Sequence, residues 1–291
     1  MASLRDLKAK IRSITNTKKI TRTMELVATS KAQRAQNRVR ATTPYSTKLR
    51  ELLVNLSGAG TVDHPLLEKR EKTRRVAVLT VTGQRGPCGG YNSNVMTITE
   101  RSREQDVADG REVDLYMVGR KGLARLRFLS LEATESYLHF DDRPSFQDAS
   151  DIAEKLMTSF LSGEVDRVVV SSTRFISIGK QIAEMTQLLP IEPPKEKEAE
   201  EKSGTTTEFI FEPNPEVMLK SILPLSVRNV VYRLLVEAVA SEQLARRMAM
   251  KRATDSADEM LGNYTRLYNR SRQAGITQQL TEIVSGASAL E

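Results

Sequence analysis

The residues best placed to do chemistry form a glycine-rich turn, Thr82–Gly90, directly after the apolar run Val76–Val81. Turns between a strand and a helix are where phosphate- and dinucleotide-binding loops occur. This turn fits neither the G-x-G-x-x-G register nor G-x-x-x-x-G-K-S/T, because Gly90 is followed by Tyr91 and Asn92. We therefore interpret it as a tight turn whose glycines permit unusual backbone angles, with a nucleotide-dependent enzyme as the alternative.

Covalent and metal-dependent chemistry have few candidate residues. Cys88 is the only cysteine, so the sequence holds no intrachain disulfide and no Cys-x-x-Cys pair, as is typical of a reducing compartment. The two histidines, His64 and His139, show no Cys-linked signature and are too few and too far apart for a zinc site. We expect no catalytic residue, no cofactor and no metal.

The charge of the chain suggests an acidic or anionic partner. The formal net charge is +7, which suits acidic proteins, nucleic acid or an anionic membrane surface. Basic residues near the start include Lys8, Lys10, Arg12, Lys18, Lys19, Arg22, Lys31, Arg34, Arg38 and Arg40. A basic coiled-coil protein that binds nucleic acid is thus an alternative function, although no recognised nucleic-acid module and no aromatic stacking residue accompany these charges.

The segment that carries these charges is predicted to be helical. Leu4 to about Val39 contains no Gly or Pro, and apolar residues recur at spacings of three and four: Leu4, Leu7, Ile11 and Ile14. The apolar stripe slips near Thr17, as at a heptad stammer, and resumes at Ile20, Met24 and Val27. Pro44 is expected to end or kink the helix before a second helical stretch, Tyr45–Leu56.

The middle of the chain alternates between strand and helix patterns. Strands are expected at Val76–Val81, Asp114–Gly119 and Arg167–Ser171, with helices at Ser93–Gln105, after Gly119 and at Ser150–Leu161. This alternation predicts a small, mainly parallel sheet with helices on both faces, a Rossmann-like α/β domain over 69–189. A charged, proline-containing linker and connection follows over 190–214.

A second long helix is predicted over 215–291, with Pro224 as a possible kink or late start. Its stripe contains Val231, Leu234, Ala238, Ala245, Met248, Ala253, Ala257, Met260, Tyr264 and Leu267. Because a compact domain returns the chain close to where it left, we expect this helix to pair antiparallel with the N-terminal helix, 1–57. The predicted fold is α/β, with a long antiparallel coiled coil of the terminal helices.

Four segments resemble the gamma subunit of F-type ATP synthases, in the order in which that family has them. They are Lys18–Ala28, Arg85–Asn94, Ser241–Asp255 and Ile276–Gly286, and the resemblance covers essentially the whole chain. The chain departs from the usual family pattern at Gln84 and Pro87, where Asp and Leu are usual. The cysteine pair of some photosynthetic members is missing, so thiol regulation is not expected.

The resemblance implies a central rotor shaft with no bond chemistry of its own. It would couple ion-driven rotation of the membrane c ring to conformational cycling of the alpha and beta subunits, one copy per complex, with epsilon as a further partner and no nucleic acid. It would lie at the cytoplasmic face of a bacterial plasma membrane, peripheral and attached through the complex. The segment Met1–Asp6 lacks the apolar core of a signal peptide.

The resemblance also assigns contacts to particular residues, each of which has a simpler explanation. Stator contacts are implied for Met24, Arg247, Gln278, Thr281 and Glu282, and c-ring contacts for Phe211 and Glu212. Met24 could instead be a coiled-coil knob and Arg247 a solvated charge. Gln278, Thr281 and Glu282 could be ordinary polar positions on a helix end.

Overall fold

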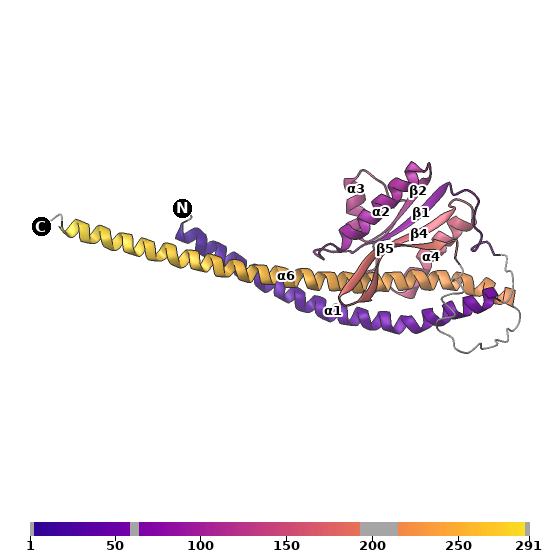
Figure 1. Cartoon of the computed structure of the whole chain (residues 1–291), viewed down its shortest axis with the longest axis horizontal. Helices are drawn as coiled ribbons and strands as arrows, with labels where there is room; N and C mark the ends of the chain where they lie inside the picture. Colours follow the sequence, from indigo (N-terminus) through magenta and orange to yellow (C-terminus); the bar gives the residue numbers. More distant parts are fainter. Residues whose placement is uncertain (1–2, 59–63, 193–214, 289–291) are drawn as a thin grey trace. The chain divides into compact units, whose positions relative to one another are not determined.

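The computed structural model describes residues 3–58, 64–192 and 215–288 (Figure 1). Contacts divide the chain into two compact units: unit 1 comprises Met1–Thr29 with Arg246–Glu291, and unit 2 comprises Ser30–Ala245. The elements are α1 (Leu4–Gly58), β1 (Arg75–Val81), α2 (Tyr91–Ala108), β2 (Glu112–Val118), α3 (Arg120–Phe128), β3 (Glu135–Tyr137), α4 (Phe146–Leu161), β4 (Arg167–Ser177), β5 (Lys180–Leu189) and α6 (Pro215–Ser288).

The centre of unit 2 is a five-stranded sheet with the order β3-β2-β1-β4-β5. The β1–β2, β1–β4 and β2–β3 pairs are parallel, and only β5 pairs antiparallel, with β4. The predicted mainly parallel sheet is therefore confirmed. Strands β3 and β5 were not predicted, and β4 continues beyond Ser171 to form a hairpin with β5.

Helices cover both faces of this sheet, as predicted (Figure 1). On one face, residues of α4 and α6 such as Ile152, Leu156 and Leu223 share a core with Leu79. On the other face, Met96 of α2 and Leu126 of α3 pack against Val78. Each fully buried side chain of this size contributes about 1.5–3 kcal/mol, so both layers stabilise the α/β fold.

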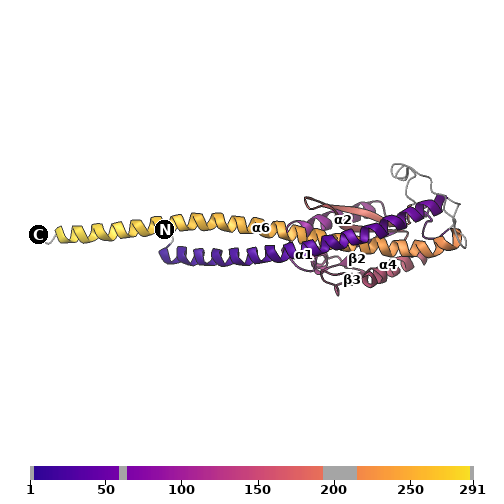
Figure 2. The same ribbon diagram turned by 90° about the horizontal axis from the view of Figure 1, so that it is seen from below.

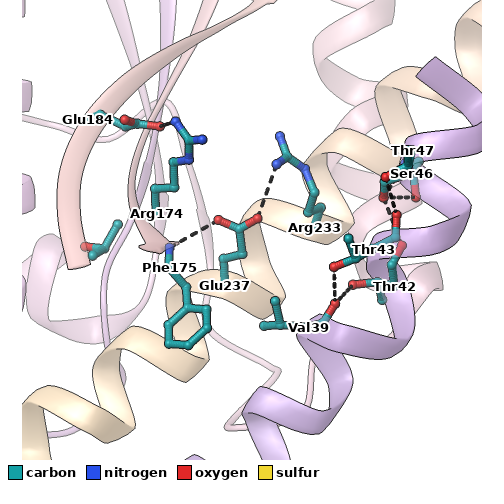
Figure 3. Close-up of polar contacts among 12 residues, drawn as sticks. Val39, Thr42, Thr43, Ser46, Thr47, Arg174, Phe175, Glu184, Arg233 and Glu237 are labelled. Atoms are coloured by element: carbon teal, nitrogen blue, oxygen red, sulfur yellow. Dashed lines mark hydrogen bonds and ion pairs between the residues drawn. The ribbon is translucent and has the colours of Figure 1, made fainter. Parts of the chain in front are cut away.

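Helix α1 runs without interruption through Pro44, so the helix does not end there, while a kink at this position stays a prediction. Hydroxyls in the surrounding turns donate to main-chain carbonyls of the preceding turn, which adds side-chain bonds on both sides of the proline (Figure 3). The hydroxyls of Thr42 and Thr43 both donate to the carbonyl of Val39, at 3.0 and 2.7 Å. Helix α6 likewise begins at Pro215 and continues through Pro224.

In unit 1 the two long helices pack antiparallel, as predicted, and both views show them side by side (Figures 1 and 2). Lys18 pairs with Asp258, and the hydroxyls of Thr21 and Thr254 are 2.9 Å apart. Lys10 lies 5.6 Å from the ring centroid of Tyr264. Residue numbers therefore rise along α1 as they fall along α6.

The predicted stammer in α1 is wrong. The positions turned toward α6 continue at spacings of three and four through Leu7, Ile11, Ile14, Lys18, Thr21, Glu25 and Ala28, all buried or half-buried. Ile20 and Val27 are instead 60% and 51% exposed. Lys18, Thr21 and Glu25 can occupy the seam because hydrogen bonds and ion pairs satisfy them there. A prediction from hydrophobicity alone therefore assigned the wrong residues of α1 to the seam.

The predicted stripe of α6 also needs correction in unit 1. Ala257 is buried and Tyr264 half-buried as predicted, but Met248, Met260 and Leu267 are 47%, 50% and 46% exposed. The side chains on the seam are Met250, Thr254, Ala257, Leu261, Tyr264 and Tyr268. This series keeps the unbroken heptad spacing that a paired helix requires.

Candidate functional site

The glycine-rich turn after β1 is held by Asn92 of α2 and by its own Thr82 and Cys88. The amide of Gly83 donates to Oδ1 of Asn92 at 2.8 Å, and Nδ2 of Asn92 donates to Sγ of Cys88 at 3.1 Å. The hydroxyl of Thr82 donates to the carbonyl of Val118 at 2.8 Å. These contacts support the interpretation of Thr82–Gly90 as a tight turn.

The segment Ser241–Gln243 of α6 joins this helix to the loops at the carboxyl edge of the sheet. All three residues are buried, although all are polar. A Cβ atom on Gly83 would lie 2.9 Å from the carboxylate of Glu242, and Gln243 donates to Oδ1 of Asp142 at 3.0 Å. The segment Ser241–Gln243 thus fixes α6 against the turn after β1 and the loop after β3.

A second polar junction ties α6 to the hairpin formed by β4 and β5 (Figure 3). Glu237 accepts a hydrogen bond from the amide of Phe175 at 3.2 Å and pairs with Arg233, also at 3.2 Å. Burial raises the pKa of Glu237, and the opposing effects of Arg233, the Phe175 amide and Arg174 do not cancel that rise. Arg174 itself pairs with Glu184 at 3.7 Å.

The sequence reasoning assigned no role to Glu237. Its signal was present, because it is a lone charge within the apolar run Leu234–Ala240. A charge in such a run is buried only when it is paired or hydrogen-bonded. Gln243 gave a weaker signal, since a polar amide at the same place on a helix is commonly solvated.

Met24 lies half-buried on α1, between the exposed side chains of Ile20 and Val27. The spacing of these three residues places them on one flank of the helix. Arg247 is half-buried, and its spacing from Met250 and Thr254 places it at a seam position of α6 rather than on a solvated face. The pairing of Thr21 with Thr254 places Arg247 at the level of Ala28, a small buried residue of α1.

Every residue from Ile276 to Ser288 is exposed on α6, including Gln278, Thr281 and Glu282. The hydroxyl of Thr281 donates to the carbonyl of Thr277, and the amide of Gln278 donates to Glu282, both at 2.9 Å. These polar groups bond within their own helix. The structure does not bring them together with Met24 or Arg247, and Phe211 and Glu212 lie outside the described residues.

Several basic residues of α1 have acidic partners within the fold. Lys18 pairs with Asp258, Arg22 with Glu25 at 2.9 Å, and Lys31 with Asp142. Part of the positive charge that suggested nucleic-acid binding is therefore neutralised internally.

Residues 3–58, 64–192 and 215–288 contain no group of three or more His, Cys, Asp or Glu side chains that could hold a metal ion. None of the helices described there is long and apolar enough to cross a membrane.

Comparison with known proteins identifies the family. The pattern of the family described as "ATP synthase" matches residues 3–290. The chain is 40% identical to the ATP synthase gamma chain of Leptospira biflexa over 291 residues, covering 100% of both. It is 42% identical to that of Mycolicibacterium vanbaalenii over 303 positions, covering 99% of this chain and 98% of the relative.

Solved structures show the same fold at lower identity. The match to a chain of the Euglena gracilis mitochondrial ATP synthase, in its OSCP/F1/c-ring structure, has a TM-score of 0.69 at 19% identity and covers 99% of this chain and 94% of that one. A chain of the rotor of the same complex matches with a TM-score of 0.65 at 18% identity, over 94% and 98%. Because the gamma chains of Leptospira biflexa and Mycolicibacterium vanbaalenii are 40% and 42% identical to this chain over almost their full length, the chain belongs to the gamma-chain family of ATP synthases.

Proposed function

We propose that the chain is the central shaft of an F-type ATP synthase, coupling rotation of a membrane c ring to the catalytic cycle of the alpha and beta subunits. The observation that carries this proposal is the distribution of side chains in unit 1. Polar residues such as Thr21, Glu25 and Thr254 occupy part of the seam between the helices. Ile20, Val27, Ile276 and Leu280 nevertheless present apolar surface outward. Such a surface indicates burial against partner proteins.

The shaft acts without bond chemistry of its own. Different faces of the two-helix unit carry different side chains, so each of three surrounding catalytic sites meets a different surface. Rotation would exchange these surfaces, and each contact would favour one conformation of the site it touches. A mechanical input changes affinity only through such differential contacts.

The remaining assignments follow from membership of the family. Alpha, beta and epsilon subunits and the c ring are the proposed partners, with one copy of this chain per complex. The chain would be peripheral, attached through the complex to the cytoplasmic face of a bacterial plasma membrane. Stator contacts are proposed for Met24, Arg247, Gln278, Thr281 and Glu282, and c-ring contacts for Phe211 and Glu212.

Met24→Lys tests the proposed stator contact. The change adds a longer, charged side chain beside exposed Ile20 and Val27. A new surface ion pair of about 1 kcal/mol with a stator carboxylate would favour one rotary position about fivefold, so coupling should fall more than assembly. We expect ATP-driven ion pumping to decrease more than ATP hydrolysis in the purified complex.

Thr29→Lys is the matched control, since Thr29 is exposed on α1 a little more than one turn beyond Met24, but its spacing from Ile20 and Val27 places it on another side of the helix. It should leave the ratio of pumping to hydrolysis unchanged. Equal losses of pumping and hydrolysis in Met24→Lys, or a complex that does not assemble, would refute the coupling role of this position.

A further inference from the structure

A groove of about 320 Å³ lies in unit 2 between α1, α6 and the loop that joins β3 to α4. Lys31, Arg34 and Arg38 line it from α1, Asp142 and Arg143 from the loop, and Gln243 from α6. Its volume falls in the range of small-ligand sites, about 300–1,000 Å³. The contacts described above leave this groove without a role.

The charges that line the groove favour an anion. Asp142 is already engaged, because it pairs with Lys31 and accepts from Gln243. The other acidic lining residue, Asp141, lies 3.9 Å from Arg85. Arg34, Arg38 and Arg143 form no ion pair with any residue in the described ranges, so three guanidinium groups remain available.

Gln243 adds a requirement that a simple anion does not meet. Gln243 is only 1% exposed. Its amide nitrogen donates to Asp142, but its Oε1 atom is buried and has no hydrogen-bond partner among the described residues. A buried acceptor without a donor is unfavourable. The group that fills this groove should therefore present a donor to Gln243 and negative oxygens to the arginines.

We propose that the groove binds inorganic phosphate. Near neutral pH, phosphate keeps at least one proton, so its P–OH group can donate to Oε1 of Gln243. Its remaining oxygens can accept from Arg34 and Arg38, which lie one turn apart on α1. Guanidinium groups bind phosphate oxygens through paired, charge-assisted hydrogen bonds.

Sulfate provides the decisive comparison. It has the same shape and a full negative charge, but near neutral pH it carries no proton and cannot donate to Gln243. A merely electrostatic site would bind both anions alike, whereas the proposed site should prefer phosphate by about tenfold, as expected for one hydrogen bond to a buried acceptor.

Equilibrium dialysis of the full-length chain with radioactive inorganic phosphate tests the proposal at constant ionic strength, since salt screens non-specific attraction. We expect saturable binding of one phosphate per chain and weaker competition by sulfate. The double variant Arg34→Gln/Arg38→Gln should weaken phosphate binding at least about tenfold. Arg40→Gln is the control, because Arg40 is exposed on the same helix and does not line the groove.

Gln243→Met tests the donor requirement separately. It should remove the preference for phosphate over sulfate while leaving some binding of both. Circular dichroism of each variant without phosphate verifies that the helices are intact. The proposal would be overturned by a wild-type chain that shows no saturable binding, by equal affinity for sulfate, or by a double variant that binds like Arg40→Gln.

Discussion

Replacing Glu237 probes the junction between α6 and the hairpin of β4 and β5 (Figure 3). The Glu237 side chain is 8% exposed, and its two oxygens separately accept from Arg233 and from the amide of Phe175. Glu237→Ala removes both acceptors and leaves the Phe175 amide unpaired. An unsatisfied polar group costs about 1–3 kcal/mol, so we expect a destabilisation of that size.

Amide hydrogen exchange measures this loss at the affected bond. Protection of the Phe175 amide should fall about 10- to 100-fold in Glu237→Ala, because about 1.4 kcal/mol corresponds to a factor of ten. Glu184→Gln is the matched control: it removes a carboxylate from the same network, next to Arg174, without touching the Phe175 amide. Protection in that variant should stay close to wild type.

Glu237→Gln separates the hydrogen bond from the charge. The amide oxygen can still accept from Phe175, so protection should largely persist. Because burial raises the pKa of Glu237 above its ordinary value of 4.5, the native state holds this proton more tightly than the unfolded state. The contribution of Glu237 to stability is therefore full below pH 4.5 and declines as pH rises through the native pKa.

Urea unfolding of the wild type and Glu237→Gln at a series of pH values measures this difference. The free energy of unfolding of the wild type should fall relative to the variant as pH rises from about 4.5. The opposite trend, with the wild type gaining relative stability at higher pH, would show that the pair with Arg233 outweighs desolvation and would refute the reasoning.

Three further predictions concern other parts of the chain. Gly119→Ala should lower the free energy of unfolding by about 2–5 kcal/mol, because φ is +93° and the new Cβ would lie 2.2 Å from the Thr82 carbonyl oxygen. Gly110→Ala, where φ is +76° and the space around the new Cβ is open, should lower it by only about 1–2 kcal/mol. Equal effects in chemical denaturation would contradict the clash at Gly119. The double variant Thr21→Val/Thr254→Val should be more stable in thermal unfolding than the sum of its single variants predicts, because each single change leaves one hydroxyl beside a methyl group; additivity would contradict their coupling. Removing Ser285 to Glu291 should loosen assembly and slow turnover without abolishing rotation, and a truncated complex that assembles normally but hydrolyses ATP without rotation in single-molecule assays would assign the drive to this end.

The sheet could be predicted from sequence because its central strands are continuous apolar runs. Val76–Val81 is buried on both faces, and no helical pattern competes with it. Strand β5 lacked such a signal, since Lys180–Leu189 mixes apolar and polar residues and most of it is only half-buried. It forms because β4 extends past the parallel sheet and offers an antiparallel partner.

The junctions of α6 could not be predicted because each depends on residues far apart in the chain. Glu237 is stabilised by Phe175, and Gln243 by Asp142, at separations of 62 and 101 residues. A helical pattern shows that such residues share a face with apolar neighbours. It does not show which loop will supply the partner that makes their burial possible.

The predicted register of the two helices in unit 1 was wrong for a different reason, and this reason bears on function. Hydrophobicity placed Ile20 and Val27 in the seam, yet the seam holds Thr21 and Glu25, and the apolar side chains face outward. A coiled coil that were stable by itself would bury the isoleucine and valine and expose the polar residues. The observed arrangement gives up part of that internal stabilisation and keeps apolar surface available for partners. Unit 1 should therefore be only weakly stable in isolation and reach its full stability when surrounding subunits bury this surface, as the proposed place inside the alpha and beta ring requires.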